Sequence, residues 1–142
     1  MKIMYVEDNP ANISLMMRVA RMGGHTVISF TNGEVVLNSY DKENPDLVFM
    51  DVQLEGRLTG LEVVRMLRDR GVKTPIVAVT AYAMLGDKER CIEAGCDTYI
   101  PKPLPIAELV ELLQRYEIET GAAGSAGAAR ATAEVPRRDP PM

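Results

Sequence analysis

The chain has 142 residues, of which 46% are hydrophobic and 25% are charged, and its net charge is −4. This length and apolar content are enough for one soluble domain with a single core. The negative charge, without a cluster of lysines and arginines, argues against a surface that follows nucleic-acid phosphates. No apolar run is long enough for a membrane span or a secretory signal. We therefore expect a cytoplasmic protein that binds neither DNA nor a membrane directly.

Two cysteines, Cys91 and Cys96, stand five residues apart, and His25 is the one histidine of the chain. This inventory fits neither a zinc site nor a disulfide framework. We interpret both cysteines as reduced residues that pack in the interior.

Short apolar segments alternate with segments of helical periodicity. Asn9-Pro10 supplies a capping residue and a proline for the start of a helix, and Gly71 and Gly95 are suited to end later helices. In chain order, the predicted elements are strand Lys2–Val6, helix Pro10–Met22, strand Thr26–Phe30, helix Glu34–Tyr40, strand Leu47–Met50, helix Gly60–Arg70, strand Ile76–Val79, helix Met84–Ala94, strand Thr98–Ile100 and helix Pro105–Glu117.

This strict alternation with short connections predicts an α/β fold. Parallel strands need crossover connections, so we expect a doubly wound sheet of five parallel strands with helices on both faces. In such sheets the carboxyl ends of the strands form the ligand crevice. The residues that follow the first, third, fourth and fifth strands should therefore meet at one edge.

Five polar residues follow these strands: Glu7, Asp8, Asp51, Thr80 and Lys102. Three carboxylates at one crevice repel each other unless a cation neutralises them, and all-oxygen ligands suit a hard ion such as Mg²⁺. Mg²⁺ often shares its shell with phosphate oxygens, which the lysine and the threonine hydroxyl would also bind. We therefore predict that Asp51 is a nucleophile for a phosphoryl group.

With these residues in order, residues 1–118 resemble the receiver domain of bacterial two-component response regulators, which implies the flavodoxin-like strand order 2-1-3-4-5. The motifs that carry the resemblance are Glu7-Asp8 after the first strand, Asp51 after PDLVFM, Thr80-Ala81 after IVAV, and Tyr99-Ile-Pro-Lys102-Pro103. The resemblance implies that Asp51 is phosphorylated and that Asp8, Asp51 and the Gln53 backbone carbonyl bind Mg²⁺. Glu7 would act through a metal-bound water.

The same resemblance implies that Lys102 contacts a phosphoryl oxygen and that Thr80 and Tyr99 form a switch pair. The donor would be a histidine kinase or a histidine phosphotransfer protein, and Ile13 and Met17 of the first helix are candidates for its docking. Met84, Leu85, Tyr99 and Ile106 are candidates for the surface that an unknown target protein binds. We expect a monomer or weak dimer that is not an enzyme beyond slow autodephosphorylation.

Three further segments carry expectations of their own. The loop VQLEGRLT at 52–59 is one residue longer than is usual in receivers. Residues 119–142 are rich in Ala, Gly and Pro, so we expect a flexible tail after a receiver domain at 1–118. Because no output domain follows, we expect a stand-alone receiver. His25 lies in a turn at the opposite end of the sheet, and we expect it to be solvated.

Other functions remain open at this point. A flavin-binding flavodoxin shares the architecture but needs a phosphate-binding loop where this chain has Glu7-Asp8. An aspartyl phosphatase needs a second acid beside its nucleophile, and positions 52 and 53 are Val and Gln. A receiver-like scaffold that binds its partner constitutively has no need of clustered acids, and a phosphoryl sink would use the same site without an output.

Overall fold

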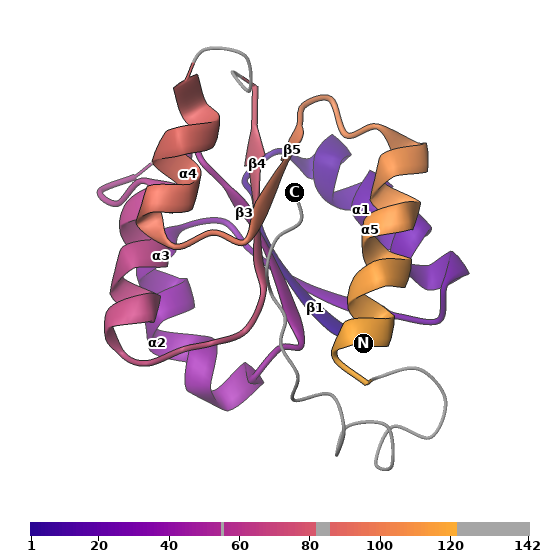
Figure 1. Cartoon of the computed structure of the whole chain (residues 1–142), viewed down its shortest axis with the longest axis horizontal. Helices are drawn as coiled ribbons and strands as arrows, with labels where there is room; N and C mark the ends of the chain where they lie inside the picture. The colour runs from indigo at the N-terminus through magenta and orange to yellow at the C-terminus, as the bar shows by residue number, and fades with distance from the viewer. Residues whose placement is uncertain (55, 82–85, 122–142) are drawn as a thin grey trace.

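The computed structural model describes residues 1–54, 56–81 and 86–121. Strands and helices alternate along these residues (Figure 1). The elements are β1 (Lys2–Val6), α1 (Pro10–Met22), β2 (Thr26–Phe30), α2 (Gly33–Glu43), β3 (Leu47–Asp51), α3 (Gly60–Asp69), β4 (Ile76–Thr80), α4 (Lys88–Ala94), β5 (Thr98–Pro101) and α5 (Ile106–Glu119). Within the described ranges, no helix is both long and apolar enough to cross a bilayer.

All strands of the sheet are parallel, and their order is β2-β1-β3-β4-β5. This confirms the predicted fold and strand order. Val6 of β1 is aligned with Met50 of β3, and Asp51 of β3 is aligned with Val79 of β4. The residues that end or follow these three strands therefore reach the same edge of the sheet.

The sheet lies between two layers of helices (Figure 1). Helices α1 and α5 pack on one face, and α2, α3 and α4 pack on the other. Successive strand residues point to opposite faces, so Tyr5 belongs to the cluster under α1 and α5, whereas Met4 and Val6 belong to the other cluster. Burial on both faces explains why the central strands are almost continuously apolar.

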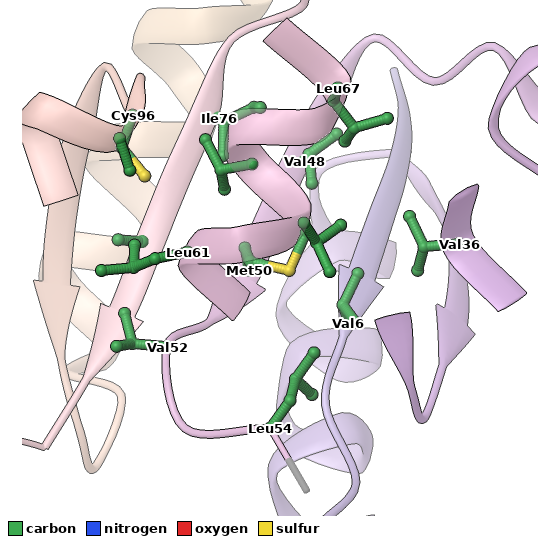
Figure 2. Packing of buried hydrophobic residues seen from close by; sticks show 14 of the residues in the cluster. Val6, Val36, Val48, Met50, Val52, Leu54, Leu61, Leu67, Ile76 and Cys96 are labelled. Atoms are coloured by element: carbon green, nitrogen blue, oxygen red, sulfur yellow. The ribbon is translucent and has the colours of Figure 1, made fainter. Parts of the chain in front are cut away.

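Figure 2 shows the cluster under α2, α3 and α4. Val6, Val48 and Ile76 extend from three strands toward the helices, where Val36 of α2 and Leu67 of α3 meet them. These side chains are fully buried. The apolar area that they remove from water is the main term that holds the helices on the sheet.

Side-chain caps fix where two helices beside the crevice begin. The Asn9 side chain accepts hydrogen bonds from the backbone N–H groups of Ala11 and Asn12, at the start of α1. Thr59 and Glu62 form a reciprocal capping box at the start of α3. These caps satisfy N–H groups that a helix end leaves without partners.

Several element boundaries differ from the predicted ones. The third, fourth and fifth strands each continue for one more residue, so Asp51 and Thr80 are themselves strand residues. Helix α2 extends to Glu43 and ends at Asn44, which adopts the left-handed conformation that polar side chains tolerate. The described part of α4 begins at Lys88. Met84, Leu85 and the tail beyond residue 121 lie outside the described residues.

The expectation of a solvated His25 is wrong, because its side chain is only 7% exposed. The amino group of Met1 lies 2.9 Å from its Nδ1 atom, and Oε1 of Glu117 lies 3.9 Å from its Nε2 atom. Burial and the nearby positive amino group lower the pKa of His25, and the Glu117 carboxylate only partly opposes this.

Candidate functional site

Asp51 is the last residue of β3, and its side chain is 2% exposed. Its Oδ1 atom accepts a hydrogen bond from the Gln53 backbone N–H at 2.9 Å, and its Oδ2 atom accepts one from Lys102 Nζ at 2.9 Å. Burial raises the pKa of Asp51 and the Glu7 charge adds to this, while these two hydrogen bonds act in the opposite direction. Asp51 is thus a desolvated carboxylate held in one orientation.

Two further carboxylates lie beside Asp51. Oxygen atoms of Glu7, Asp8 and Asp51 all lie within 4.8 Å of one another. The Glu7 side chain is fully buried, whereas Asp8 is more exposed. The three acids that the sequence places after β1 and β3 therefore form one cluster, as predicted from the strand order.

The buried Glu7 side chain is fixed by donors on both oxygens. The Tyr5 hydroxyl donates to Oε1 at 2.9 Å, and the Asn9 backbone N–H donates to Oε2 at 3.1 Å. Lys102 Nζ also lies 3.3 Å from Oε1. A fully buried carboxylate needs such partners, because an isolated one would be strongly destabilising.

Lys102 joins the fifth strand to the acidic cluster. Its Nζ atom contacts both Asp51 and Glu7, and its backbone N–H donates to the Thr80 carbonyl at 2.9 Å. Partial burial lowers the pKa of Lys102, but its hydrogen bond to Asp51 and the two carboxylate charges outweigh burial, so the net pKa is raised. The peptide bond from Lys102 to Pro103 is cis. Lys102 is thus a charged group directed at Asp51, and its predicted contact with a phosphoryl oxygen stays a prediction.

The two residues of the predicted switch pair lie on neighbouring strands. Thr80 ends β4, is fully buried and donates its hydroxyl proton to Oδ2 of Asp87 at 2.5 Å. Tyr99 pairs with Ala78 across β4 and β5 and is partly buried against the cluster under α2, α3 and α4. Lys88 Nζ lies 5.9 Å from the centre of the Tyr99 ring. Both residues are close to the crevice by strand position, and their switching remains a prediction.

Sequence reasoning did not single out two residues that touch this set. Tyr5 is two residues before Glu7 and on the same side of the strand, and its hydroxyl reaches the acid. Asp87 is 4% exposed, and its carboxylate accepts hydrogen bonds from the Thr80 hydroxyl and from an Arg90 N–H. A polar residue seven positions after Thr80 gives no signal of this contact in the sequence alone.

The donor set fits a hard divalent cation. Three carboxylates face each other, and Lys102 is the cation that contacts Glu7 and Asp51. Among the described residues the carboxylates of the cluster thus outnumber this one ammonium group, and a Mg²⁺ ion would balance them with the oxygen ligands that it prefers. The Gln53 backbone is close to the cluster through its N–H, and ligation by its carbonyl stays a prediction.

A cavity of about 420 Å³ lies next to the loop that follows Asp51. Val52 and Gln53 form one side of it, and Asp87 and Arg90 form another. The residues that complete its lining are Thr59, Leu61, Glu62 and Arg65. The structure thus places open space beside the partner of Thr80.

Comparison with protein families identifies the domain. The family described as response regulator receiver domain matches residues 3–114. The chain belongs to this family. It is a receiver domain of the two-component type, in which such domains interact with histidine kinases and with downstream proteins. The predicted family is confirmed, and the flavodoxin and phosphatase alternatives lose their basis.

Curated relatives and solved structures are also response regulators or receiver domains. The receiver is 38% identical over 116 residues to the polar-differentiation response regulator DivK of Brucella anthropi, covering 80% of this chain and 94% of that protein. It is 36% identical to the receiver domain of a sensor histidine kinase from Pseudomonas aeruginosa PAO1, with a TM-score of 0.73 and coverage of 81% and 95%. That structure has a magnesium ion coordinated in its active-site cleft.

A third comparison supports the fold. The BeF₃-activated N-terminal receiver domain of RstA from Klebsiella pneumoniae is 29% identical to this receiver, with a TM-score of 0.75, and the match covers 82% of this chain and 97% of that one. The predicted architecture and the family thus agree with both sequence and structure comparisons.

Proposed function

We propose that Asp51 accepts a phosphoryl group from a phosphohistidine of a histidine kinase or a histidine phosphotransfer protein. The observation that carries this proposal is the contact between Asp51 Oδ2 and Lys102 Nζ at 2.9 Å inside an acidic, buried cluster. An Asp51 oxygen attacks phosphorus, an O–P bond forms and the donor's N–P bond breaks, leaving its electron pair on the imidazole. Attack of water on phosphorus later restores the carboxylate, slowly.

In this proposal Asp8, Asp51 and the Gln53 carbonyl would hold Mg²⁺, and Glu7 would contribute through a water. The excess of three carboxylates over one lysine ammonium group among the described residues of the cluster supports this assignment. When bound, the ion supplies charge neutralisation for the phosphoryl oxygens. Lys102 then moves its contact from Asp51 to a phosphoryl oxygen, while Tyr5 and Asn9 keep Glu7 in place.

The phosphoryl group adds charge and acceptor oxygens beside the buried Asp51 side chain, and this biases which of two conformations the domain adopts. Thr80 turns its hydroxyl toward the phosphoryl group, and Tyr99 moves inward behind it. The partly exposed Tyr99 and the 55% exposed Ile106 support an output face around β5 and the start of α5. The signal leaves by phosphorylation-dependent protein contact or by a further phosphoryl transfer.

We also infer that the domain works in the cytoplasm. Cys91 and Cys96 are both buried and both free, which is usual for proteins of reducing compartments. The phosphohistidine donors of two-component pathways would meet the domain there.

A mapping experiment tests the proposal. The protein is incubated with acetyl phosphate and Mg²⁺, and the acyl phosphate is reduced with borohydride, which converts the phosphorylated aspartate to homoserine. Peptide mass spectrometry should then find homoserine at position 51 only when Mg²⁺ is present. Homoserine at another aspartate, with position 51 unchanged, would refute the assignment of Asp51.

A further inference from the structure

Asp87 is a buried acid that contacts Thr80 and Arg90, and the proposed phosphoryl transfer does not use it. Its side chain is 4% exposed, although it stands directly before α4. It does not cap that helix with its carboxylate. Oδ2 accepts the Thr80 hydroxyl at 2.5 Å, and Oδ1 accepts Arg90 Nη1 at 2.5 Å. An aspartate directly before a helix commonly caps it, but the Asp87 carboxylate accepts the Thr80 hydroxyl instead.

The Thr80 hydroxyl has one proton to donate. While that proton is donated to Asp87, it is not available to a phosphoryl oxygen on Asp51. The acceptor is an ionisable carboxylate, and hydrogen bonds to charged acceptors are roughly twice as strong as those between neutral groups. The Asp87 carboxylate and a phosphoryl group on Asp51 therefore compete for the same proton.

We propose that Asp87 is a positioning residue that restrains the Thr80 hydroxyl, that the Arg90 contact weakens this restraint, and that the restraint sets how readily the domain switches on phosphorylation. This inference rests on the proposed function of Asp51 and adds the regulation of that site. Thr80 must leave Asp87 before it can bind the phosphoryl group, so the strength of this contact sets the fraction of molecules that are ready to react.

The cavity beside the site leaves room for the Asp87 side chain to change its rotamer. Asp87 and Arg90 both line this space of about 420 Å³, together with Gln53 from the loop after Asp51. Arg65, on α3, lines it as well. When Thr80 leaves, the carboxylate can turn toward this space, where Arg90 and Arg65 offset its charge. A buried carboxylate that lost its donor without such an outlet would be strongly destabilised.

The proposal predicts that two substitutions change the rate of phosphorylation in opposite directions. Asp87→Asn keeps the shape but replaces the charged acceptor with a neutral one, so phosphorylation by acetyl phosphate should become about fivefold faster. Arg90→Gln removes the second donor of Asp87, which then holds Thr80 more tightly, so the reaction should become about twofold slower. Arg90→Lys keeps the charge and should restore the wild-type rate.

If Asp87 only supported the fold of α4, both substitutions would change the rate in the same direction. A double-mutant cycle separates the two roles further. In a Thr80→Val background, which lacks the hydroxyl, Asp87→Asn should no longer accelerate the reaction. The same acceleration with and without the hydroxyl, or rate changes of the same sign for Asp87→Asn and Arg90→Gln, would overturn the proposal.

A measurement without phosphodonor separates this proposal from the proposed function. Three-bond couplings in NMR spectra report the χ1 rotamer of Thr80 in the unphosphorylated protein. Wild-type protein should show one rotamer, and Asp87→Asn should show rotamer averaging. A single unchanged rotamer in Asp87→Asn would overturn the restraint even if Asp51 is phosphorylated. Rotamer averaging without phosphorylation of Asp51 would refute only the proposed function.

Discussion

Lys102 Nζ lies 2.9 Å from Oδ2 of Asp51, although the two residues are 51 positions apart in the chain. The same atom lies 3.3 Å from Oε1 of Glu7. One ammonium group therefore neutralises part of the charge of the cluster formed by Glu7, Asp8 and Asp51. In the proposed function a metal ion would compete with Lys102 for the same carboxylate, and this competition would have measurable consequences.

Lys102→Met should separate metal binding from phosphoryl transfer. Without the competing cation the cluster becomes more negative, so the affinity for Mg²⁺ should rise several-fold. Phosphorylation by acetyl phosphate should become roughly 100-fold slower, because a donor to the transferred group is lost. Mg²⁺ titration and phosphorylation kinetics check both effects. Lys73→Met, at an exposed lysine, is the matched control. A variant that lost both activities together would contradict the role given to Lys102.

Gly60→Ala should disturb Asp51 through the backbone. A Cβ atom at Gly60 would lie 2.0 Å from the Asp51 carbonyl oxygen, so α3 and the end of β3 would have to move apart. We expect a loss of about 1–3 kcal/mol in the free energy of unfolding and slower phosphorylation. Urea denaturation measures the free energy of unfolding, and intact-mass spectrometry over time measures the rate of phosphorylation.

The control for this substitution is Gly71→Ala. Gly71 has a positive φ of 94° and nothing near the added Cβ, so the change strains only the turn after α3. Stability should fall while the phosphorylation rate stays at the wild-type value. Equal slowing in both variants would mean that Gly60 acts through general stability and not through Asp51.

Much of the site was predictable because topology places it. In a parallel doubly wound sheet, the residues after β1, β3 and β5 must meet, so Glu7, Asp51 and Lys102 could be brought together from their positions alone. Element type followed from periodicity and caps, such as Asn9 before Pro10. The ends of strands were less predictable, because Asp51 and Thr80 pair in the sheet although they are polar.

Contacts that depend on side-chain direction were not predictable. Tyr5 in an apolar strand is expected to pack, and its hydroxyl bond to Glu7 depends on the orientation of both side chains. The Asp87 contact crosses from the end of β4 to the start of α4. The burial of His25 also escaped the sequence, because the N-terminal amino group and α5 that surround it are distant along the chain.

Polar substitution of Ile13 and Met17 should weaken docking of the phosphodonor protein. Met17 is 39% exposed on α1, and Ile13, in the first turn of the same helix, is partly buried against the hydrophobic cluster under α1 and α5. In Ile13→Ser/Met17→Gln, transfer from a phosphorylated histidine phosphotransfer protein should be about tenfold slower. Phosphorylation by acetyl phosphate, which needs no docking surface, should not change.

Val35→Gln is the matched control for docking, because Val35 is 40% exposed on α2. Circular dichroism and urea denaturation establish that all variants are folded. Unaltered transfer from the protein donor to a folded double variant would exclude a docking role for this surface.

His25 should make stability depend on pH. Its pKa is lowered in the folded state, so below the ordinary value of 6.5 the unfolded chain binds more protons than the folded one. Stability should therefore be constant above that value and should fall as pH decreases below it, through the folded pKa. Urea denaturation at a series of pH values checks this. His25→Gln should flatten the decrease. A wild-type curve that rises toward low pH would contradict the assigned environment.

The central claim is that the clustered carboxylates bind a magnesium ion and present Asp51 to a transferable phosphoryl group. Intact-mass spectrometry after incubation with acetyl phosphate, with and without Mg²⁺, tests it most directly. Wild-type protein should gain the mass of one phosphoryl group only with Mg²⁺, and Asp51→Asn should gain none. Equal adducts on wild type and Asp51→Asn, or an adduct independent of Mg²⁺, would contradict the account.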